Sequence, residues 1–545
     1  MSKDKITMDA FMDEQVKRAI DWDFILEKMR PLTPYGLEYK KALRPYPLGT
    51  EDYLRRDLDL LEIILSWDRE QAKEALKLLH TVKDIRYSLR RAKGGNILSE
   101  VEIFEIKSLV YASQHLQKFL PEKARDDVKL TFVPLDELMD YLNPEGQNPQ
   151  SFYLYDSYSD FLTKSRKRRS QLENEYRASL RSIRSKLKEE YDLALGGDLT
   201  ITLPKDDKKA LARAESAPYL TYNQETFHNV IFSLKPGAEL LNLQEDIEKA
   251  KSKEFDATQR VLQEISQEIA KYDKKIKTNI HAIANLDLYL AKADLTRKIG
   301  GVKPEIIEEH RLELVEGRYP KIEENLKREN MSFTSISISL KEGVTCITGA
   351  NMGGKTISLK LVGLVSVMAQ MGLFVPARSL RLGLNAFVRT SIGDYQSTTS
   401  GLSTFGGEIE NVTHAIARAH QRGLLLIDEL ARGTNPQEGY AISLAIVRFL
   451  RDKPAMTLLT THFDKVTHLE GIKHLQVVGL ANIDLEELEA HEGDPLRGIN
   501  ELMDYHLMEV SNLDEVPKDA IRIAHLMGLP REITSYAIDT LKNGW

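Results

Sequence analysis

Cysteine is almost absent from this sequence, which has a single one, Cys346, among 545 residues. One thiol excludes an intrachain disulfide framework and a thiolate metal site, and such sparse use is typical of proteins in a reducing cytoplasm. The amino-terminal stretch MSKDKITMDAFMDEQ also lacks the continuous apolar segment of a secretion signal. We therefore expect a cytoplasmic protein.

Long apolar runs are missing as well. The most apolar long window, residues 357–377, is interrupted by Lys360 and Gln370 and ends at Pro376. Because this window begins directly after a glycine-rich loop, we expect a buried helix of a nucleotide-binding core rather than a membrane span.

Positive charge is not in excess over the whole chain, since the formal net charge is −7. This excludes a uniformly basic nucleic-acid binder but not a local basic patch, because binding responds to the local field. Hydrophobic residues make up 42% of the sequence and charged residues 29%, which supports large folded cores and argues against disorder. The length predicts about two to four domains.

The pattern of apolar and polar residues changes twice along the chain. Residues 1–159 place apolar side chains at helical spacing, as in LDLLEIILSWDREQAKEALKLLHTV, and predict an all-α lever or core domain. In residues 301–545, short apolar stretches such as SISISL, GVTCITG, NAFVRT, GLLLIDE, MTLLTTH and LQVVGL alternate with helical ones. This alternation predicts an α/β domain with a largely parallel sheet.

The middle segment, residues 160–300, predicts a protruding arm. Two polar stretches, at about 160–192 and 239–293, have the length of helices that extend beyond about 45 Å. Helices of this length usually pair as an antiparallel coiled coil. Between them, GGDLTITLPKDD and HNVIFSLKPGAE indicate short strands, so we expect a small clamp tip between an outgoing and a returning helix.

A phosphate-binding loop is predicted within ITGANMGGKT. Its spacing fits the pattern G-x4-G-K-[ST], with an apolar strand before it and a helix after it. Backbone N–H groups of such a loop point at phosphates, the lysine reaches the β- and γ-phosphates, and the threonine hydroxyl binds magnesium. The predicted ATP-binding residues are Gly349, Ala350, Asn351, Met352, Gly353, Gly354, Lys355 and Thr356.

Acidic residues follow a later buried strand, in GLLLIDE. Asp428 is placed to hold Mg²⁺ together with Thr356, and Glu429 to polarise the attacking water, because the carboxyl ends of parallel strands face one crevice. His462 ends the next strand, MTLLTTH, where a histidine can sense the γ-phosphate. A surface or core histidine is the open alternative for His462. Glu429 and His462 are the predicted catalytic residues.

Two further segments each leave two interpretations open. Ser403, in GLSTFGG, either caps the following helix or presents its hydroxyl and N–H groups to an anion. The run KSRKRRSQ is either a solvated helix face or a surface for a polyanion. Ten Lys or Arg against two acids between Lys164 and Lys188 favour the polyanion. The predicted DNA contacts are Lys164, Arg166, Lys167, Arg168 and Arg169.

The motifs ITGANMGGKT, LSTFGGEI, LLIDELARGT and TTHF, in this order and spacing, resemble the MutS family of ATPases. The resemblance covers about 310–535, with GRYP, GLFVPA and GLPREITSYAIDTL, and NIHAIANLDLYLAKADL is similar to the segment that returns from the family's clamp. GTNPQEG is similar to a subfamily without mismatch-reading function that often carries a small nuclease domain. Arg432, in ELARGT, looks more like the repair branch.

The resemblance implies an ABC-type P-loop ATPase that works as a homodimer or heterodimer with composite sites. It implies that Ser403 of one subunit contacts the γ-phosphate held by the other, that Glu429 activates water, and that His462 is a switch residue. Phe333 is placed like the family's adenine-stacking aromatic, although a buried strand phenylalanine explains it equally well. The carboxy-terminal helices are expected to form a dimerisation segment.

The mismatch reader Phe-x-Glu of some family members and the extension of the nuclease-bearing ones are not found, so we expect a short member without either. The resemblance then implies a clamp on DNA that ATP moves, in mismatch repair or recombination. The alternative is an ATP-driven factor that remodels a protein partner, since some short members are associated with cobalamin-dependent amino-acid aminomutases.

Overall fold

The computed structural model describes residues 7–146, 152–349, 354–393, 404–431, 434–479, 503–510 and 519–542. Contacts divide the chain into two compact units. The first comprises Met1–Leu76, Glu122–Leu130 and Ile283–Trp545, and the second Lys77–Pro121 and Thr131–Ala282. The predicted domain limits were placed where the hydrophobic pattern of the sequence changes, not where contacts divide the chain, and they stay predictions.

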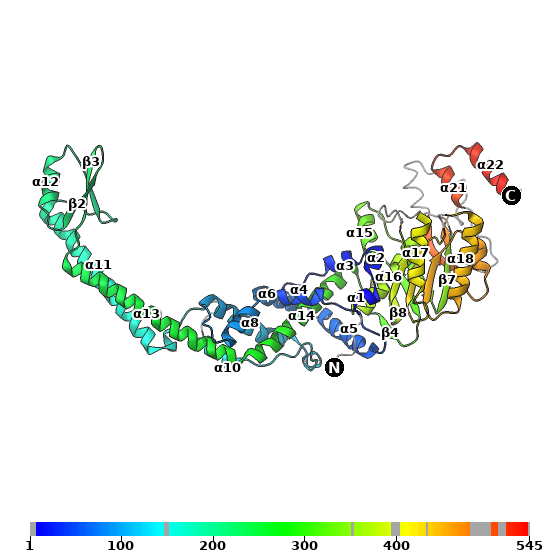
Figure 1. Cartoon of the computed structure of the whole chain (residues 1–545), viewed down its shortest axis with the longest axis horizontal. Helices are drawn as coiled ribbons and strands as arrows, with labels where there is room; N and C mark the ends of the chain where they lie inside the picture. The colour runs from blue at the N-terminus through cyan, green and yellow to red at the C-terminus, as the bar shows by residue number, and fades with distance from the viewer. Residues whose placement is uncertain are drawn as a thin grey trace. The chain divides into compact units, whose positions relative to one another are not determined.

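A six-stranded sheet forms the centre of the first unit, in the order β13-β12-β7-β11-β10-β9. Five strands are parallel and β13 pairs with β12 in the antiparallel sense, which confirms the predicted, largely parallel α/β arrangement (Figure 1). The strands are β7 (Gly343–Thr348), β9 (Val388–Ser391), β10 (Leu424–Ile427), β11 (Met456–Thr460), β12 (Lys473–Gly479) and β13 (Asp504–Glu509).

Helices cover both faces of this sheet, which explains why its strands read as continuous apolar runs. Leu424 and Leu426 of β10 belong to a core shared with α16 (Lys355–Gln370). Leu425 and Ile427 belong to a second core, shared with α17 (Thr404–Ile416) and α18 (Pro436–Arg451). The apolar window after the glycine loop is therefore a buried helix, as predicted. No helix among the described residues is long and apolar enough to cross a membrane.

The amino-terminal helices of the first unit complete the core on the α16 side. Phe11, Ile20 and Trp22 are buried in the same cluster as the side chains of α16. A four-stranded sheet in the order β4-β8-β5-β6 adds to it. Its strands are β4 (Glu305–Ile307), β5 (Leu312–Gly317), β6 (Ile336–Leu340) and β8 (Ser379–Gly383).

The remaining helices of the first unit, and those at its limits, are as follows. Within it lie α1 (Met8–Phe11), α2 (Glu14–Ala19), α3 (Trp22–Lys28), α4 (Pro34–Lys41), α5 (Glu51–Leu65), α9 (Glu122–Arg125), α15 (Pro320–Arg328), the 3-10 helix η2 (Asp464–His468), α21 (Asp519–Leu526) and α22 (Arg531–Lys542). Two helices extend across the limits between the units, α6 (Arg69–Thr81) and α14 (Asp273–Ile299).

A buried charge cluster joins three elements of the first unit. Asp57 on α5 accepts hydrogen bonds from Lys129 and from the Tyr289 hydroxyl of α14. Lys292 Nζ, also on α14, lies 3.4 Å from Asp57 Oδ2 and donates to the Gly372 carbonyl, just after α16, at 3.0 Å. Burial alone raises the pKa of Asp57, but the two lysines outweigh it, and the pKa is lowered to about 2.

Two long helices dominate the second unit, α11 (Asp160–Tyr191) and α13 (Ala238–Lys271), which lie side by side (Figure 1). Leu172 of α11 is buried between them. Arg169 contacts Glu254 at 3.1 Å, whereas Tyr176, later on α11, accepts a hydrogen bond from Gln244 at 2.9 Å. Contacts that advance along α11 thus move backward along α13, so the pair is antiparallel.

A small sheet with one helix connects α11 to α13. Its strand order is β1-β3-β2, all antiparallel, and two of its strands fall where the sequence predicts them. The sequence does not predict β2, because five of its six residues are exposed and mostly polar. The elements are β1 (Thr200–Pro204), α12 (Lys208–Ser216), β2 (Leu220–Glu225) and β3 (Asn229–Leu234).

The returning helix predicted at about 239–293 is not continuous. It is interrupted at Tyr272, which ends α13 with φ −93° and ψ 5° before α14 begins. The Tyr272 hydroxyl donates to Glu137 at 3.0 Å, a tertiary contact that no local sequence pattern indicates. The other helices of the second unit are α7 (Arg86–Lys93), α8 (Glu100–Phe119), α10 (Asp136–Leu142) and the 3-10 helix η1 (Asp156–Tyr158).

Candidate nucleotide-binding site

The predicted phosphate loop leaves β7 and enters α16, and glycines hold its two ends. Gly349 has φ 125° and Gly354 has φ 76°, conformations that side chains rarely adopt. A Cβ atom would lie 3.1 Å from Val477 at the first position and 3.2 Å from the Tyr505 ring at the second. The loop residues between them, Ala350, Asn351, Met352 and Gly353, lie outside the described residues.

Lys355 is the first residue of α16 and is almost fully buried. Its Nζ donates a hydrogen bond to the carbonyl of Gly349 at 2.5 Å, so the ammonium lies beside the end of β7 rather than in solvent. A helix N-terminus and a lysine at one loop favour an anion, because the N–H groups and the ammonium all carry positive charge.

Strand ends bring the predicted magnesium ligands together. The parallel register pairs Ile427 of β10 with Leu459 of β11, so the next residues, Asp428 and Thr460, meet at the carboxyl edge of the sheet. Thr356 Oγ1 donates to Asp428 Oδ2 at 2.8 Å, and Thr460 Oγ1 donates to Asp428 Oδ1 at 2.7 Å. Both carboxylate oxygens of Asp428 are thus held by hydroxyl groups.

Thr460, the last residue of β11, is a site residue that the sequence analysis missed. Besides its bond to Asp428, its hydroxyl accepts a hydrogen bond from the backbone N–H of Glu429 at 2.8 Å. Threonine is common in strands, so its presence in MTLLTTH carries no signal of its own. Its role depends on the end of the neighbouring strand, where it positions two acidic residues at once.

Glu429 and His462, the predicted catalytic pair, are in direct contact. His462 Nε2 lies 2.8 Å from Glu429 Oε1, and the side chain of Glu429 is 17% exposed. Glu429 has φ 48°, in the left-handed region that a non-glycine residue seldom adopts. Strained backbone of this kind persists where surrounding contacts impose it, as the bond to Thr460 does here. A water beside Glu429 would meet a carboxylate of fixed position.

The pair Thr356 and Asp428 fits a magnesium ion. Mg²⁺ prefers oxygen ligands and is usually held by one or two carboxylates together with substrate phosphates and water. A hydroxyl and a carboxylate 2.8 Å apart, beside the phosphate loop, supply such ligands. Within the described residues no group of three or more His, Cys, Asp or Glu could hold a metal ion by itself.

The other predicted nucleotide contacts, Phe333 and Ser403, are not placed at the carboxyl edge of the sheet by any described contact. Phe333 is half-buried and packs against the core on the α16 side. Ser403 lies outside the described residues, as does Arg432, and α17 begins at Thr404. Tyr505 on β13 was missed, because only the pairing of β13 with β12 brings its ring against Gly354.

The predicted DNA contacts all lie on α11, in the second unit. Arg166 donates to Asp156 at 2.8 Å, and Arg169 pairs with Glu254 at 3.1 Å. Lys164, Lys167 and Arg168 are exposed. The run is therefore divided between side chains with acidic partners and side chains in solvent.

Comparisons with known proteins match the part of the chain that contains the candidate site. The family described as MutS domain V matches residues 345–543, which contain the phosphate loop and both strand ends. The endonuclease MutS2 of Clostridium kluyveri is 30% identical over 421 residues, which are 73% of this chain and 51% of that protein. The endonuclease MutS2 of Geobacillus thermodenitrificans is 29% identical over 475 residues, 84% of this chain and 58% of that protein.

A third relative, the putative endonuclease MutS2 of Bacillus subtilis, is 26% identical over 500 residues, 88% of this chain and 60% of that protein. The chain thus spans about half to three-fifths of the length of these curated relatives. The matched domain, the similar proteins and the arrangement at the strand ends agree with one another, and the chain belongs to the MutS family of ATPases.

Proposed function

We propose that this protein binds ATP with Mg²⁺, hydrolyses it, and uses the cycle to move a clamp on DNA. One observation carries the hydrolytic part of the proposal. At one edge of the sheet, Asp428 touches the hydroxyl of Thr356 while the adjacent Glu429 touches His462. A metal-binding group and a base for water therefore lie next to each other beside the loop.

Each residue has a proposed task. The loop N–H groups and Lys355 orient the phosphates of ATP, and Thr356 and Asp428 hold Mg²⁺. When bound, the ion neutralises charge that develops on the phosphate oxygens. Glu429 accepts a proton from the attacking water, and His462 keeps its carboxylate in place.

A composite site is part of the proposal. We infer that Ser403 of a second subunit, in a homodimer or a heterodimer, contacts the γ-phosphate, as the family resemblance implies. Exposed apolar side chains on α22 support a dimerisation segment at the end of the chain: Ile533 is 52% exposed and Tyr536 is 78% exposed.

DNA is the proposed cargo. The similar proteins are named endonucleases, and an endonuclease acts on nucleic acid. In this proposal residues 1–159 form the lever domain, 160–300 the coiled-coil arm with its clamp tip, and 301–545 the ATPase domain. The antiparallel packing of α11 on α13 supports the arm. Action on a protein partner is the competing hypothesis, and failure of DNA binding in every nucleotide state would favour it.

Two variants test the hydrolytic site. Lys355→Ala should lose affinity for a fluorescent ATP analogue, because the ammonium beside Gly349 is gone. Glu429→Gln should keep that affinity and slow hydrolysis by about 100-fold or more, the usual contribution of a general base. Hydrolysis by Glu429→Gln at the unchanged rate would refute the role of Glu429.

A further inference from the structure

Eight of the ten Lys and Arg of α11 fall into two groups; Arg168 and Lys186, whose ammonium lies 5.8 Å from the Tyr219 ring centroid, belong to neither. In the first, three arginines are engaged within the second unit: Arg166 with Asp156, Arg169 with Glu254, and Arg184 with the Gly196 carbonyl at 3.1 Å. These contacts give the three guanidinium groups acceptors within the unit, although the side chain of Arg169 stays 40% exposed. The arginines of the first group therefore stabilise the packing of the second unit.

The second group lies on a surface that we call the outer face, defined by Lys164, Lys167, Arg177, Arg181 and Lys188. All five side chains are exposed, and no hydrogen bond or ion pair within the described parts of the chain engages any of them. Lys167, Arg181 and Lys188 are separated by multiples of seven residues, so they repeat on one side of the helix.

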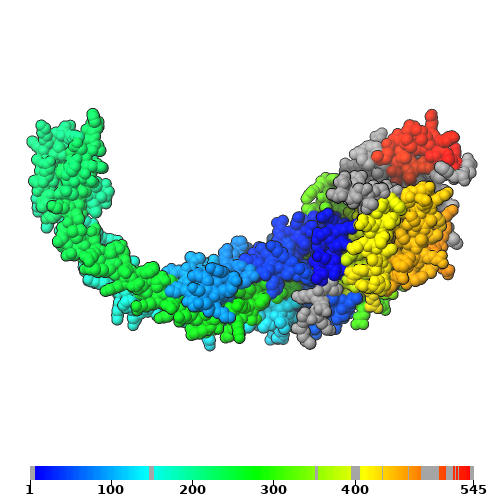
Figure 2. Space-filling model, in the orientation of Figure 1, coloured from blue at the N-terminus to red at the C-terminus, as the bar shows by residue number. Residues whose placement is uncertain are grey.

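Helix geometry places this face away from α13. Leu162, Leu172 and Leu187 are the buried side chains of α11, and α13 packs over Leu172. At 3.6 residues per turn, Lys167, Asn174 and Arg181 lie on the side opposite to those leucines. In the space-filling view, much of the α11 and α13 pair is covered by no other element (Figure 2).

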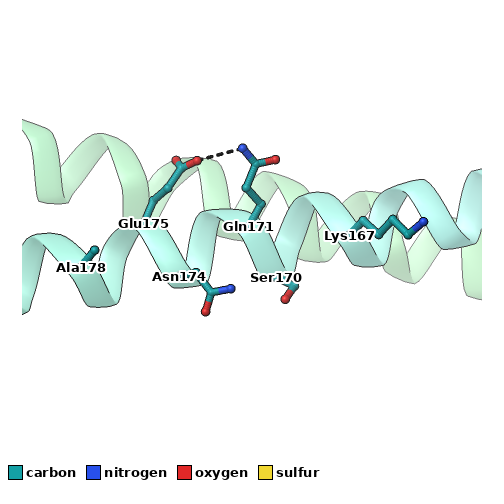
Figure 3. Close-up of a pocket in the computed structure, with 6 residues that line it drawn as sticks. All are labelled: Lys167, Ser170, Gln171, Asn174, Glu175 and Ala178. Atoms are coloured by element: carbon teal, nitrogen blue, oxygen red, sulfur yellow. Dashed lines mark hydrogen bonds between the residues drawn. The ribbon is translucent and has the colours of Figure 1, made fainter.

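Acids on α11 offset the charge of the outer face only in part. Two acids lie between Lys164 and Lys188. Glu173 is 3.5 Å from Arg169, and Glu175, which lines the same open hollow as Lys167, accepts a hydrogen bond from Gln171 at 3.0 Å (Figure 3). Both carboxylates are thus engaged with neighbours on α11. With the exposed Asp160, Glu189 and Glu190 near its two ends, α11 carries five acids against ten Lys and Arg, so its net charge is positive although the chain as a whole is acidic.

The partner helix has the opposite character. Between Glu239 and Lys271, α13 carries eight acids and five bases. Several of them pair within α13, with Lys249 Nζ 2.7 Å from Glu245 and Lys251 Nζ 2.8 Å from Glu248. Excess positive charge is therefore confined to one side of the helix pair, which an ordinary solvated surface of mixed charge does not require.

The dimensions of the outer face fit a duplex. From Lys167 to Lys188 the helix extends about 31 Å, close to the 34–36 Å of one turn of DNA. An open hollow between these cations is lined by Lys167, Ser170, Gln171, Asn174, Glu175 and Ala178, of which Ser170, Asn174 and Ala178 are short (Figure 3). A phosphate backbone could approach the helix closely there.

The aromatic content of this stretch favours phosphates over bases. The aromatic residue between Lys164 and Lys188 is Tyr176, whose hydroxyl accepts a hydrogen bond from Gln244 of α13. Its ring therefore belongs to the contact between the two helices rather than to the outer face. Cations without stacking platforms are typical of contact with the phosphate backbone.

We propose that the outer face of α11 binds the phosphate backbone of duplex DNA without sequence preference, whereas Arg166 and Arg169 serve the packing of the second unit. This inference rests on the proposed action on DNA. It names the contacting side chains and leaves out three residues that the sequence assigns to DNA, Arg166, Arg168 and Arg169.

Two charge-matched variants test it in the full-length chain. The first carries Lys167→Gln, Arg177→Gln, Arg181→Gln and Lys188→Gln, and the second carries Lys249→Gln, Lys251→Gln, Lys253→Gln and Lys271→Gln. Each lowers the formal net charge from −7 by four. Glutamine keeps helix propensity close to that of Lys and Arg, and circular dichroism checks that helix content is unchanged.

The measurement is the affinity for a duplex of about 30 base pairs, by fluorescence anisotropy, between about 50 and 200 mM salt. The slope of log K against log salt should fall by about 0.9 for each phosphate that the protein no longer neutralises, up to about 3.6 in the α11 variant. The α13 variant should keep the slope of the unchanged protein. Equal decreases of the slope in both variants would overturn the inference.

Failure of the proposed function gives a different result. If the unchanged protein binds no duplex at low salt with ATP, ADP or no nucleotide, action on DNA is refuted and the inference with it. If the unchanged protein binds and the slope of the α11 variant does not fall, the inference alone is wrong. A third variant, Arg166→Gln with Arg169→Gln, should keep the slope and instead lower the thermal unfolding midpoint.

Discussion

Asp57→Asn should strongly destabilise the first unit, because it removes the carboxylate from the buried charge cluster. Asp57 is 4% exposed and Lys292 is 2% exposed, so neither charge can turn to water. Without the carboxylate, the Lys292 ammonium keeps carbonyl oxygens as acceptors, of which the nearest is that of Gly372 at 3.0 Å. Lys129 is affected less, because its side chain is 41% exposed.

Two independent comparisons give the expected loss in the free energy of unfolding. Removing one partner of a buried ion pair costs about 3–5 kcal/mol. A pKa of about 2 in place of the ordinary 3.8 corresponds to about 2.4 kcal/mol of favourable interaction with the ionised carboxylate. We therefore expect Asp57→Asn to lower the free energy of unfolding of this unit by about 2–5 kcal/mol.

Tryptophan fluorescence during urea unfolding measures this quantity in the unit concerned. The chain has three tryptophans, Trp22, Trp67 and Trp545, and all three belong to the first unit. Trp22 is 1% exposed and Trp67 is 7% exposed, so unfolding changes their surroundings strongly. The signal therefore reports on the first unit without a contribution from the second.

A double variant supplies the control. Asp57→Asn with Lys292→Met removes both buried charges, so it should be more stable than the sum of the single changes predicts, by about 1–3 kcal/mol. A cost below about 1 kcal/mol for Asp57→Asn, or strictly additive costs, would refute the reasoning.

Acid should act on the same group. Because the folded-state pKa of Asp57 lies below the ordinary 3.8, its contribution is complete above about pH 4 and is lost as the pH falls toward 2. The stability difference between the unchanged protein and Asp57→Asn should therefore shrink over that interval. A difference that stays constant from roughly pH 5 to roughly pH 2 would contradict the low pKa.

Three further predictions concern the nucleotide site. Thr460→Val should slow hydrolysis by about tenfold or more and weaken its dependence on Mg²⁺, because the Thr460 hydroxyl holds Asp428 and Glu429 in place. Steady-state turnover across a magnesium titration measures both effects. Gly354→Ala should weaken binding of an ATP analogue, because the residue has φ 76° and a Cβ would lie 3.2 Å from the Tyr505 ring; unchanged affinity would contradict it. Ser403→Ala and Glu429→Gln subunits, each slow alone, should regain turnover when they are mixed if sites are composite, because the site of the Ser403→Ala subunit then combines its own Glu429 with Ser403 of its partner; turnover that stays low in the mixture would contradict composite sites.

Local patterns predict the α/β part of the fold well. The strand of GVTCITG, the glycine loop and the following helix correspond to β7 and α16. They are predictable because sequential elements with strong apolar patterns keep their type in most tertiary contexts. β2 was not predictable, since its exposed residues leave no alternation, and neither was the interruption at Tyr272, which a contact with Glu137 accompanies.

Some residues of the candidate site could likewise be predicted from the sequence, and others could not. Asp428, Glu429 and His462 follow apolar strands, so their position at one edge could be inferred from the sequence. Thr460 and Tyr505 could not, because their contacts depend on strand register and on the pairing of β13. The Asp57 cluster joins residues up to 235 positions apart, and no local pattern indicates such a pair.

The short strand β10 has a consequence for how this sequence can change over evolution. Its four residues are all buried, and the fixed pairing of Ile427 with Leu459 sets which acidic residue meets Thr460. Side chains alternate between faces, so loss or gain of one residue within β10 would exchange Asp428 for a neighbour at that position. The connection through α18 can vary in length without this effect. Insertions and deletions in descendants of this sequence should therefore accumulate in connections, while the length of β10 stays constant.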